Sequence, residues 1–244
     1  MRIQLAKHVC SVAIAAVVLS GCATTANNPK DPYEGFNRAM FAVNEGIDVV
    51  AKPVAQGYDA AAPLPVKAGI GNFFGNLADV WTAVNNFLQG KGGQGLSDVG
   101  RVLVNTTIGI GGVFDVASEM GLEKHAEDFG QTLGTWGVGD GPYFYWPLIG
   151  PRTTRDTLGW AVDSYADPVW YVDDVALRNS LVGVRFIDLR ASLLPTDKVV
   201  EQAAFDKYNY IRDAYLQSRR SQIADGKTPI EGRGDGECKT TRCY

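Results

Sequence analysis

Histidine is scarce in this chain, and the common hydrolytic motifs are missing. The 244 residues include two histidines, His8 and His125, and neither a G-x-S-x-G nor an H-E-x-x-H motif occurs. A catalytic triad or a zinc site would have to be built around His125, in a polar stretch (residues 123–127) typical of a solvated loop. We therefore expect no catalytic residue and no metal site.

Nucleotide-binding signatures and excess positive charge are absent as well. The glycines of residues 109–112 lack the G-x-G-x-x-G spacing and follow no predicted strand, so they indicate a tight turn or close helix packing. Lysine and arginine total 23 against 27 aspartates and glutamates, a net charge of −4. A mildly acidic chain has no electrostatic footprint for nucleic acid. We expect neither a cofactor nor a nucleic-acid partner.

The N-terminus has the pattern of an exported, lipidated protein. Arg2 and Lys7 precede an apolar run over residues 9–19, which ends in the sequence LSGC at Cys22. This arrangement resembles the bacterial lipobox, in which the cysteine thiol is acylated and the preceding peptide is removed. No aspartate follows Cys22 to act as an inner-membrane retention signal, so the outer membrane is the expected destination. Three acyl chains are more than stable anchoring requires.

Lipidation at Cys22 gives the expected organisation of the chain. Residues 1–21 form a lipoprotein signal peptide, 22–30 a lipidated tether, 31–225 a helical domain and 226–244 a disordered tail. Processing would remove Cys10 and acylate Cys22, so Cys238 and Cys243 are the thiols that remain. In an oxidising compartment they could pair, or stay as free thiols.

Helical periodicity dominates the expected domain. Apolar residues recur every three or four positions between Phe36 and Val54, and a second helix is expected from Pro65 to Gln89. The second helix has Asp79 as its only charge between Ala68 and Gln89, but its asparagines argue against a helix in contact with lipid along its whole length. An interfacial helix and a core helix of a soluble bundle stay equally open. A flexible joint is expected at residues 90–95, and residues 195–197 are expected to cap the last helix.

The stretch from Gly141 to Pro151 contains no charged residue. Aromatic and aliphatic side chains lie between Pro142, Pro147 and Pro151, which cannot belong to one regular helix. The stretch is also too short to cross a bilayer as a helix. Two interpretations remain, a buried loop of a soluble core or a re-entrant element that faces a cavity.

The chain resembles the MlaA/VacJ family of phospholipid-binding lipoproteins. The resemblance is carried by five segments in the family's order, at residues 31–38 (DPYEGFNR), 72–77 (NFFGNL), 101–109 (RVLVNTTIG), 128–134 (DFGQTLG) and 141–151 (GPY to PLIGP). It implies an all-α ring in the inner leaflet of the outer membrane. Through its amphipathic channel, misplaced phospholipid of the outer leaflet would pass to a periplasmic shuttle, and a trimeric porin is an implied partner.

A lipid path needs polar groups for the head group, behind an apolar loop that can move. Arginine suits a phosphate best. For Arg155 and Asp156, a helix-terminal or internal salt-bridge role is the alternative, and it is the more usual one. Candidates for the path are Asp128, Gln131, Arg152, Arg155 and Asp156; candidates for the gate are Gly141, Pro142, Tyr143, Pro147, Gly150 and Pro151, with Gly139, Gly141 and Gly150 as hinges.

Two other classes of function remain open. A periplasmic lipid hydrolase would depend on His125, whereas a transporter would not. A structural lipoprotein that tethers a porin would tolerate changes in the Gly141–Pro151 loop. The sequence does not decide the head-group selectivity, the direction of transport or the identity of the porin.

Overall fold

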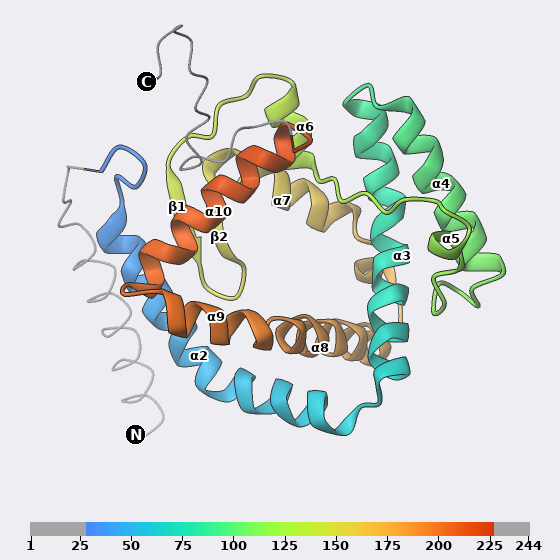
Figure 1. Cartoon of the computed structure of the whole chain (residues 1–244), viewed down its shortest axis with the longest axis horizontal. Helices are drawn as coiled ribbons and strands as arrows, with labels where there is room; N and C mark the ends of the chain where they lie inside the picture. The colour runs from blue at the N-terminus through green and yellow to red at the C-terminus, as the bar shows by residue number, and fades with distance from the viewer. Residues whose placement is uncertain (1–27, 227–244) are drawn as a thin grey trace, which may run out of the picture.

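Helices form nearly the whole fold, which confirms the all-α class. The computed structural model describes residues 28–226. Seen in projection, the helices surround an open centre, with α3 on one side, α2 and α8 below and the hairpin opposite α3 (Figure 1). The helices are α2 (Glu34–Ala61), α3 (Leu64–Leu88), α4 (Gly92–Thr107), α5 (Val116–Glu119), α6 (Phe129–Thr135), α7 (Thr154–Ala166), the 3-10 helix η1 (Pro168–Tyr171), α8 (Val175–Ser192), α9 (Leu194–Ala203) and α10 (Lys207–Ile223).

Polar caps explain where several of these helices begin. The side chains of Asp128, Asp174 and Asp206 each accept a hydrogen bond from a backbone N–H in the first turn of α6, α8 and α10. Such a cap satisfies a backbone donor that has no partner inside the helix. None of the helices within residues 28–226 is both long and apolar enough to cross a bilayer.

The uncharged stretch is more regular than the sequence indicated. Strands β1 (Tyr143–Trp146) and β2 (Gly150–Thr153) pair in an antiparallel hairpin, with Tyr145 opposite Pro151. A two-stranded hairpin has two edges, so a proline that lacks an N–H can stand on it without breaking an interior ladder. Leu148 in the turn and Gly150 at the start of β2 have φ angles of 64° and 86°. The expected irregular loop is thus confined to the turn between the strands.

Two helix boundaries differ from those expected. The joint at residues 90–95 is shorter, because α4 already begins at Gly92. The C-terminal segment forms two helices, since the chain leaves the helical conformation at Ala204 and Asp206 starts α10. Pro195 therefore lies in the first turn of α9 and not at the start of the last helix. Asp206 is also bound by Arg38 of α2, at 2.8 Å, which fixes this break in place.

Aromatic residues form the core of the hairpin side. Tyr143 and Tyr145 of β1 are buried with Tyr208 of α10, and Phe41 of α2 packs edge-on against Tyr145 and Tyr208. The core thus joins the two ends of the described chain through the hairpin. Cys22, the signal peptide and the tail from residue 227 lie outside the described residues, so their assignments stay predictions.

Candidate functional site

The pair of helices α3 and α4 has polar side chains on its inside. Asn86 of α3 is buried and donates from Nδ2 to Oδ2 of Asp98 on α4, at 2.7 Å. Buried polar groups are tolerated when they find such partners. The buried polar residues of the pair are Asn76, Asp79, Thr82, Asn85, Asn86, Asp98, Arg101 and Asn105.

Arg101 is the centre of this buried polar group. Its side chain is 1% exposed, with Nε 3.4 Å from Oδ2 of Asp79 and Nη2 3.0 Å from Oδ1 of Asp115. Nη1 donates to the carbonyl oxygen of Leu122 at 2.6 Å. Lys124 binds the other oxygen of Asp79 at 2.5 Å, from the surface. The interior of α3 and α4 is therefore held by ion pairs and hydrogen bonds.

The outside of the same helix pair is apolar. Leu96 and Leu103 of α4 are 68% and 61% exposed, and Val80 of α3 is 46% exposed. We call this surface the outer face of α3–α4; it consists of Val80, Val84, Phe87, Leu88, Leu96, Val99 and Leu103. The members on each helix follow one another at helical spacing and so share a face, and an exposed apolar face on a folded chain marks a contact with a membrane or another protein. One side of α3 is packed in protein and the other is exposed, so an interfacial helix and a core helix both stay predictions for residues 65–89.

Four of the five candidates for the lipid path meet where α6, α7 and α10 join. Asp128 binds Arg219 of α10 through both oxygens, at 2.5 and 2.6 Å. Asp156 contacts Arg155 at 3.0 Å and accepts a hydrogen bond from Tyr215 at 2.6 Å. We call this set the junction; it consists of Asp128, Gln131, Arg155, Asp156, Tyr215 and Arg219.

The remaining contacts of the junction use up most of its polar groups. Buried Gln131 donates from Nε2 to the carbonyl oxygen of Ala126 at 3.0 Å. Buried Arg155 also binds Asp140, at 2.5 Å. These contacts match the internal salt-bridge role that was the alternative for Arg155 and Asp156.

The partners of Asp128 and Asp156 in the junction keep both carboxylates charged. Burial by itself raises the pKa of Asp128, but the hydrogen bond and charge of Arg219 outweigh it and leave that pKa below its ordinary value. Burial likewise raises the pKa of Asp156, and Arg219 and Tyr215 outweigh it in the same way. Burial also raises the pKa of the Tyr215 hydroxyl, so this group stays protonated and donates to Asp156.

Arg152 is the candidate without an ion pair among the described residues. It stands on β2 opposite Phe144, and its guanidinium lies over the indole ring of Trp160, 5.7 Å from the ring centre. Its Nε is buried and has no hydrogen-bond partner, and burial lowers the pKa of its guanidinium. An arginine held this way has donors left for an anion.

The candidate gate corresponds to the hairpin and its turn. Tyr143 lies on β1, Gly150 and Pro151 on β2, and Pro147 in the turn, whereas Gly141 (φ 67°) and Pro142 precede the hairpin. The turn covers a cavity of about 390 Å³ lined by residues of α2, α8, α9 and α10 as well as by residues 148–151.

Asn44 of α2 holds this turn in place. Its Oδ1 accepts from the backbone N–H of Leu148 at 3.0 Å, and its Nδ2 donates to the hydroxyl of Tyr145 at 3.4 Å. Asn44, Tyr215 and Arg219 were not among the site residues predicted from the sequence. The latter two stand one helical turn apart on α10, which was the available signal that they share a face.

His125 is partly buried and pairs with buried Asp98. Its Nδ1 lies 2.8 Å from Oδ1 of Asp98, and no hydroxyl or thiol of residues 28–226 makes a hydrogen bond to its other ring nitrogen. A hydrolytic triad needs such a nucleophile. Within the described part of the chain, no group of histidine, cysteine and acidic side chains is arranged to hold a metal ion.

A known protein family matches most of this chain. A family model described as MlaA lipoprotein matches residues 29–222. The chain belongs to the MlaA lipoprotein family. Among its relatives is the intermembrane phospholipid transport system lipoprotein MlaA of Shigella flexneri, 36% identical over 88% of each chain. The protein of the same name from Haemophilus influenzae is 30% identical over 91% of this chain and 92% of its own.

A solved structure has the same fold. It comes from work on the structural basis for maintenance of bacterial outer membrane lipid asymmetry, and it is 35% identical to this chain. The TM-score is 0.69, and the match covers 79% of this chain and 98% of the other. The MlaA family resemblance seen in the sequence motifs is thereby confirmed.

Proposed function

We propose that this protein is an outer-membrane lipoprotein that takes misplaced phospholipid from the outer leaflet and passes it to the periplasm. In this role it maintains the lipid asymmetry of the outer membrane. The proposal agrees with the phospholipid transport named for the Shigella and Haemophilus relatives and with the subject of the solved structure. Acylation of Cys22 would anchor the chain to the periplasmic side of the membrane.

The observation that carries the proposal is the reversed polarity of α3 and α4. Their charged and amide groups are packed inside, and their aliphatic side chains are exposed. Removing exposed apolar surface from water is worth about 25 cal/mol per Å². Contact of this face with acyl chains therefore has a lower free energy than contact with water. The ring would therefore lie in the inner leaflet, with α9 and α10 toward the periplasm.

The path of the lipid would run through the centre of the ring, past the hairpin. We keep Asp128, Gln131, Arg152, Arg155 and Asp156 as the polar side of that path. Arg152 is the member best suited to contact a phosphate directly, because it has no ion pair within residues 28–226. The others support it through the junction. The hairpin from Gly141 to Pro151 would act as the gate, with its movement limited by Asn44.

Two protein partners follow from this role. A soluble periplasmic shuttle must accept the lipid, because acyl chains do not cross water unaccompanied. A trimeric porin would hold the ring at the correct depth in the membrane. Both partners are inferred from the resemblance to the family.

A transfer assay tests the proposal. The lipidated protein from Cys22 onward is reconstituted in vesicles with labelled phospholipid, an acceptor is added, and the lipid is analysed by mass spectrometry. We expect intact labelled phospholipid on the acceptor, and less of it after changes in the hairpin turn. Lysolipid or free fatty acid that disappears in His125→Ala would instead identify a lipid hydrolase. Normal porin binding without any lipid transfer would identify a structural lipoprotein.

A further inference from the structure

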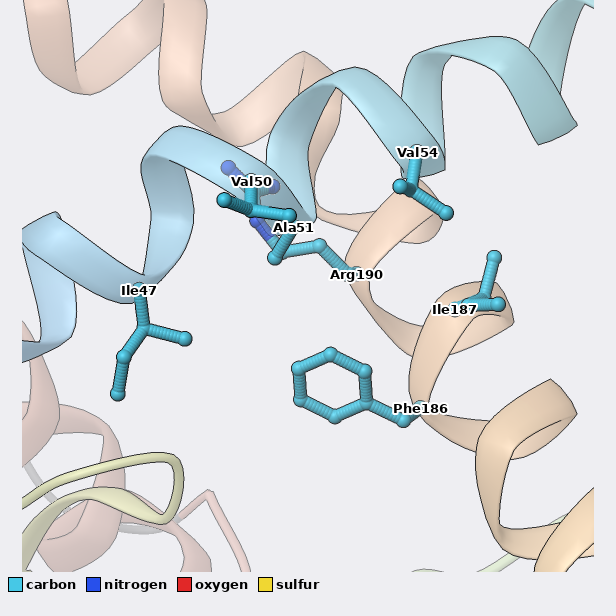
Figure 2. Close-up of a pocket in the computed structure, with 7 residues that line it drawn as sticks. All are labelled: Ile47, Val50, Ala51, Val54, Phe186, Ile187 and Arg190. Carbon is cyan, nitrogen blue, oxygen red and sulfur yellow. The ribbon is translucent and has the colours of Figure 1, made fainter. Parts of the chain in front are cut away.

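A narrow apolar groove lies between α2 and α8, away from the junction. Figure 2 shows the ring of Phe186 and the side chain of Ile47 pointing into the space between the two helices. The groove has a volume of about 260 Å³. Its lining consists of Ile47, Val50, Ala51, Val54, Phe186, Ile187 and Arg190.

The groove adjoins the cavity beneath the hairpin turn. Ile47, Ala51, Phe186 and Arg190 line both spaces. The cavity differs from the groove because polar side chains also line it, among them Asn44, Glu45, Asp48 and Asp197. The two spaces together are apolar at one end and polar at the other, which is the pattern of an amphiphilic molecule.

Arg190 stands between the two ends. Its Nε and Nη2 donate to the two oxygens of Asp48, at 2.6 and 2.8 Å, and Nη2 also donates to Asp197 at 2.6 Å. Its Nη1 is buried and has no hydrogen-bond partner. Leaving a buried donor unsatisfied is unfavourable. A ligand oxygen that enters from the adjoining cavity, after a small side-chain movement, would satisfy it.

The fixed charges around Arg190 indicate which kind of oxygen fits. Glu45 is paired with Lys207 at 3.1 Å, and Asp197 lies 3.4 Å from Lys52 as well as next to Arg190. Lys52 also binds Glu201, at 3.0 Å, so with Asp48 there are four acidic groups to three cations, and no positive charge is left over for an anion. A neutral ester carbonyl is the acceptor that adds no further negative charge.

The other end of the groove opens on exposed apolar surface. Val50 and Val54 are 69% and 48% exposed on α2. An acyl chain in surrounding lipid could therefore enter the groove without crossing a polar barrier. An amphipathic helical peptide would also cover apolar side chains, but most of its backbone carbonyls accept hydrogen bonds within the helix, so it would leave the buried donor of Arg190 without an acceptor.

We propose that the groove between α2 and α8 binds one acyl chain of a phospholipid, with the ester region at Arg190. The hairpin turn covers the polar end of this site. The inference rests on the proposed function, since it identifies where the transported lipid is held. The site extends the role of the hairpin, because movement of the turn would uncover the ester region of a lipid already bound by its chain.

Photo-crosslinking tests the site. The full lipidated protein is placed in vesicles that contain a phospholipid with a diazirine in one acyl chain, and adducts are mapped after irradiation. We expect adducts in the peptides that contain Val50, Val54 and Phe186. Ala51→Phe, which adds a ring where the two spaces meet, should lower these adducts about tenfold, as expected when roughly two methylene groups lose their contacts.

Matched variants separate blocking of the groove from loss of the fold. Val49 is 74% exposed and does not line the groove, so Val49→Phe should leave the adducts unchanged. If circular dichroism shows that Ala51→Phe does not fold, Val54→Trp at the open end of the groove is used in its place. The same loss of lipid adducts is expected for this variant. Adducts that both variants leave unchanged, or crosslinked protein dimers in place of lipid adducts, would overturn the site. Intact lipid transfer without groove adducts refutes the site alone, whereas absence of transfer refutes the proposed function.

Discussion

The α3–α4 pair and the region of the hairpin and α10 are built in opposite ways. In α3–α4 an arginine that is 1% exposed sits among carboxylates and amides, while Leu96 and Leu103 face outward. In the hairpin region Tyr143, Tyr145 and Tyr208 are buried, and charged residues such as Lys207 and Glu45 form ion pairs at the surface. One chain therefore has two arrangements of polarity.

The difference indicates which surroundings each region meets. Apolar groups lie inside where water is outside, and this preference weakens where the outside is itself apolar. The buried ion pairs then give α3 and α4 a defined packing that apolar contacts alone would not. The aromatic core of the hairpin follows the rule for a protein in water, although Arg212 and Arg219 of helix α10 are each 7% exposed and paired with buried carboxylates.

The largest expected effect comes from removing the centre of the polar interior. Arg101→Met leaves Asp79 and Asp115 without their guanidinium partner, and breaking a buried pair this way costs about 3–5 kcal/mol of the free energy of unfolding. Chemical denaturation followed by circular dichroism measures it. Lys124→Met is the matched control, since this side chain is 46% exposed and also binds Asp79; its loss should cost about 1 kcal/mol or less. Equal effects of the two substitutions would contradict the comparison.

Alkaline pH should act on the hairpin region. Burial raises the pKa of Tyr145 to about 12. A raised pKa means that the fold favours the neutral phenol, so the stabilisation is complete below the ordinary value near pH 10 and is lost as the pH rises toward 12. Over that interval the contribution of Tyr145 to the free energy of unfolding is about 2–3 kcal/mol.

Tyr145→Phe isolates this contribution. The variant should lose less stability than the wild type between pH 10 and 12, and should differ from it by about 1 kcal/mol or less at pH 7, where only the hydrogen bond with Asn44 is missing. No tyrosine occurs in residues 64–107, so α3 and α4 have no phenol of their own to titrate. Identical pH profiles for the two proteins would show that burial does not raise the pKa of Tyr145.

The outer face of α3–α4 should determine membrane affinity more than stability. Leu103→Lys, made in a form that lacks the acylated cysteine, should bind vesicles about tenfold less tightly, because an apolar contact is lost and a charge must stay hydrated. Co-flotation with vesicles measures this affinity. Val199 of α9 is 55% exposed, and Val199→Lys should leave binding unchanged. An equal loss in both variants would mean that the chain does not bind through one face.

The smallest expected effect concerns the turn of the hairpin. Asn44→Ala removes the acceptor for the N–H of Leu148, and one such hydrogen bond is worth about 0.5–1.5 kcal/mol. Hydrogen exchange of the Leu148 amide should become faster while exchange in α3 stays the same. Asn44→Asp keeps an acceptor and serves as the control. Unchanged exchange at Leu148 in Asn44→Ala would exclude Asn44 as the residue that holds the turn.

The sequence predicted the helices better than it predicted their ends. The spacing of apolar residues from Phe36 to Val54 predicted α2, and the uncharged stretch was recognised as non-helical. The break at Ala204 was missed, because the periodicity of α9 continues in α10 and the ion pair of Asp206 with Arg38 joins it to a distant helix. The pairing of β1 with β2 was missed because its prolines suit only edge strands.

The candidate site was predicted in part. Asp128, Arg155 and Asp156 were recognised as related residues, but the partner that joins Asp128 to Asp156 is Arg219, far along the chain. No local pattern reports a contact over such a distance. The reversed polarity of α3 and α4 was equally invisible, since the sequence shows that a helix has two faces but not which one is covered. The lipid-path and gate assignments stay predictions.

One measurement tests most directly whether the outer face of α3–α4 meets lipid. Single fluorophores are attached at position 103 or position 199, after Cys238 and Cys243 are replaced by serine, in the lipidated protein bound to vesicles. We expect quenchers on the acyl chains to quench position 103 and a water-soluble quencher to quench position 199. If the water-soluble quencher reaches both positions equally, the outer face of α3–α4 lies in water, and the account of a ring within the membrane is wrong.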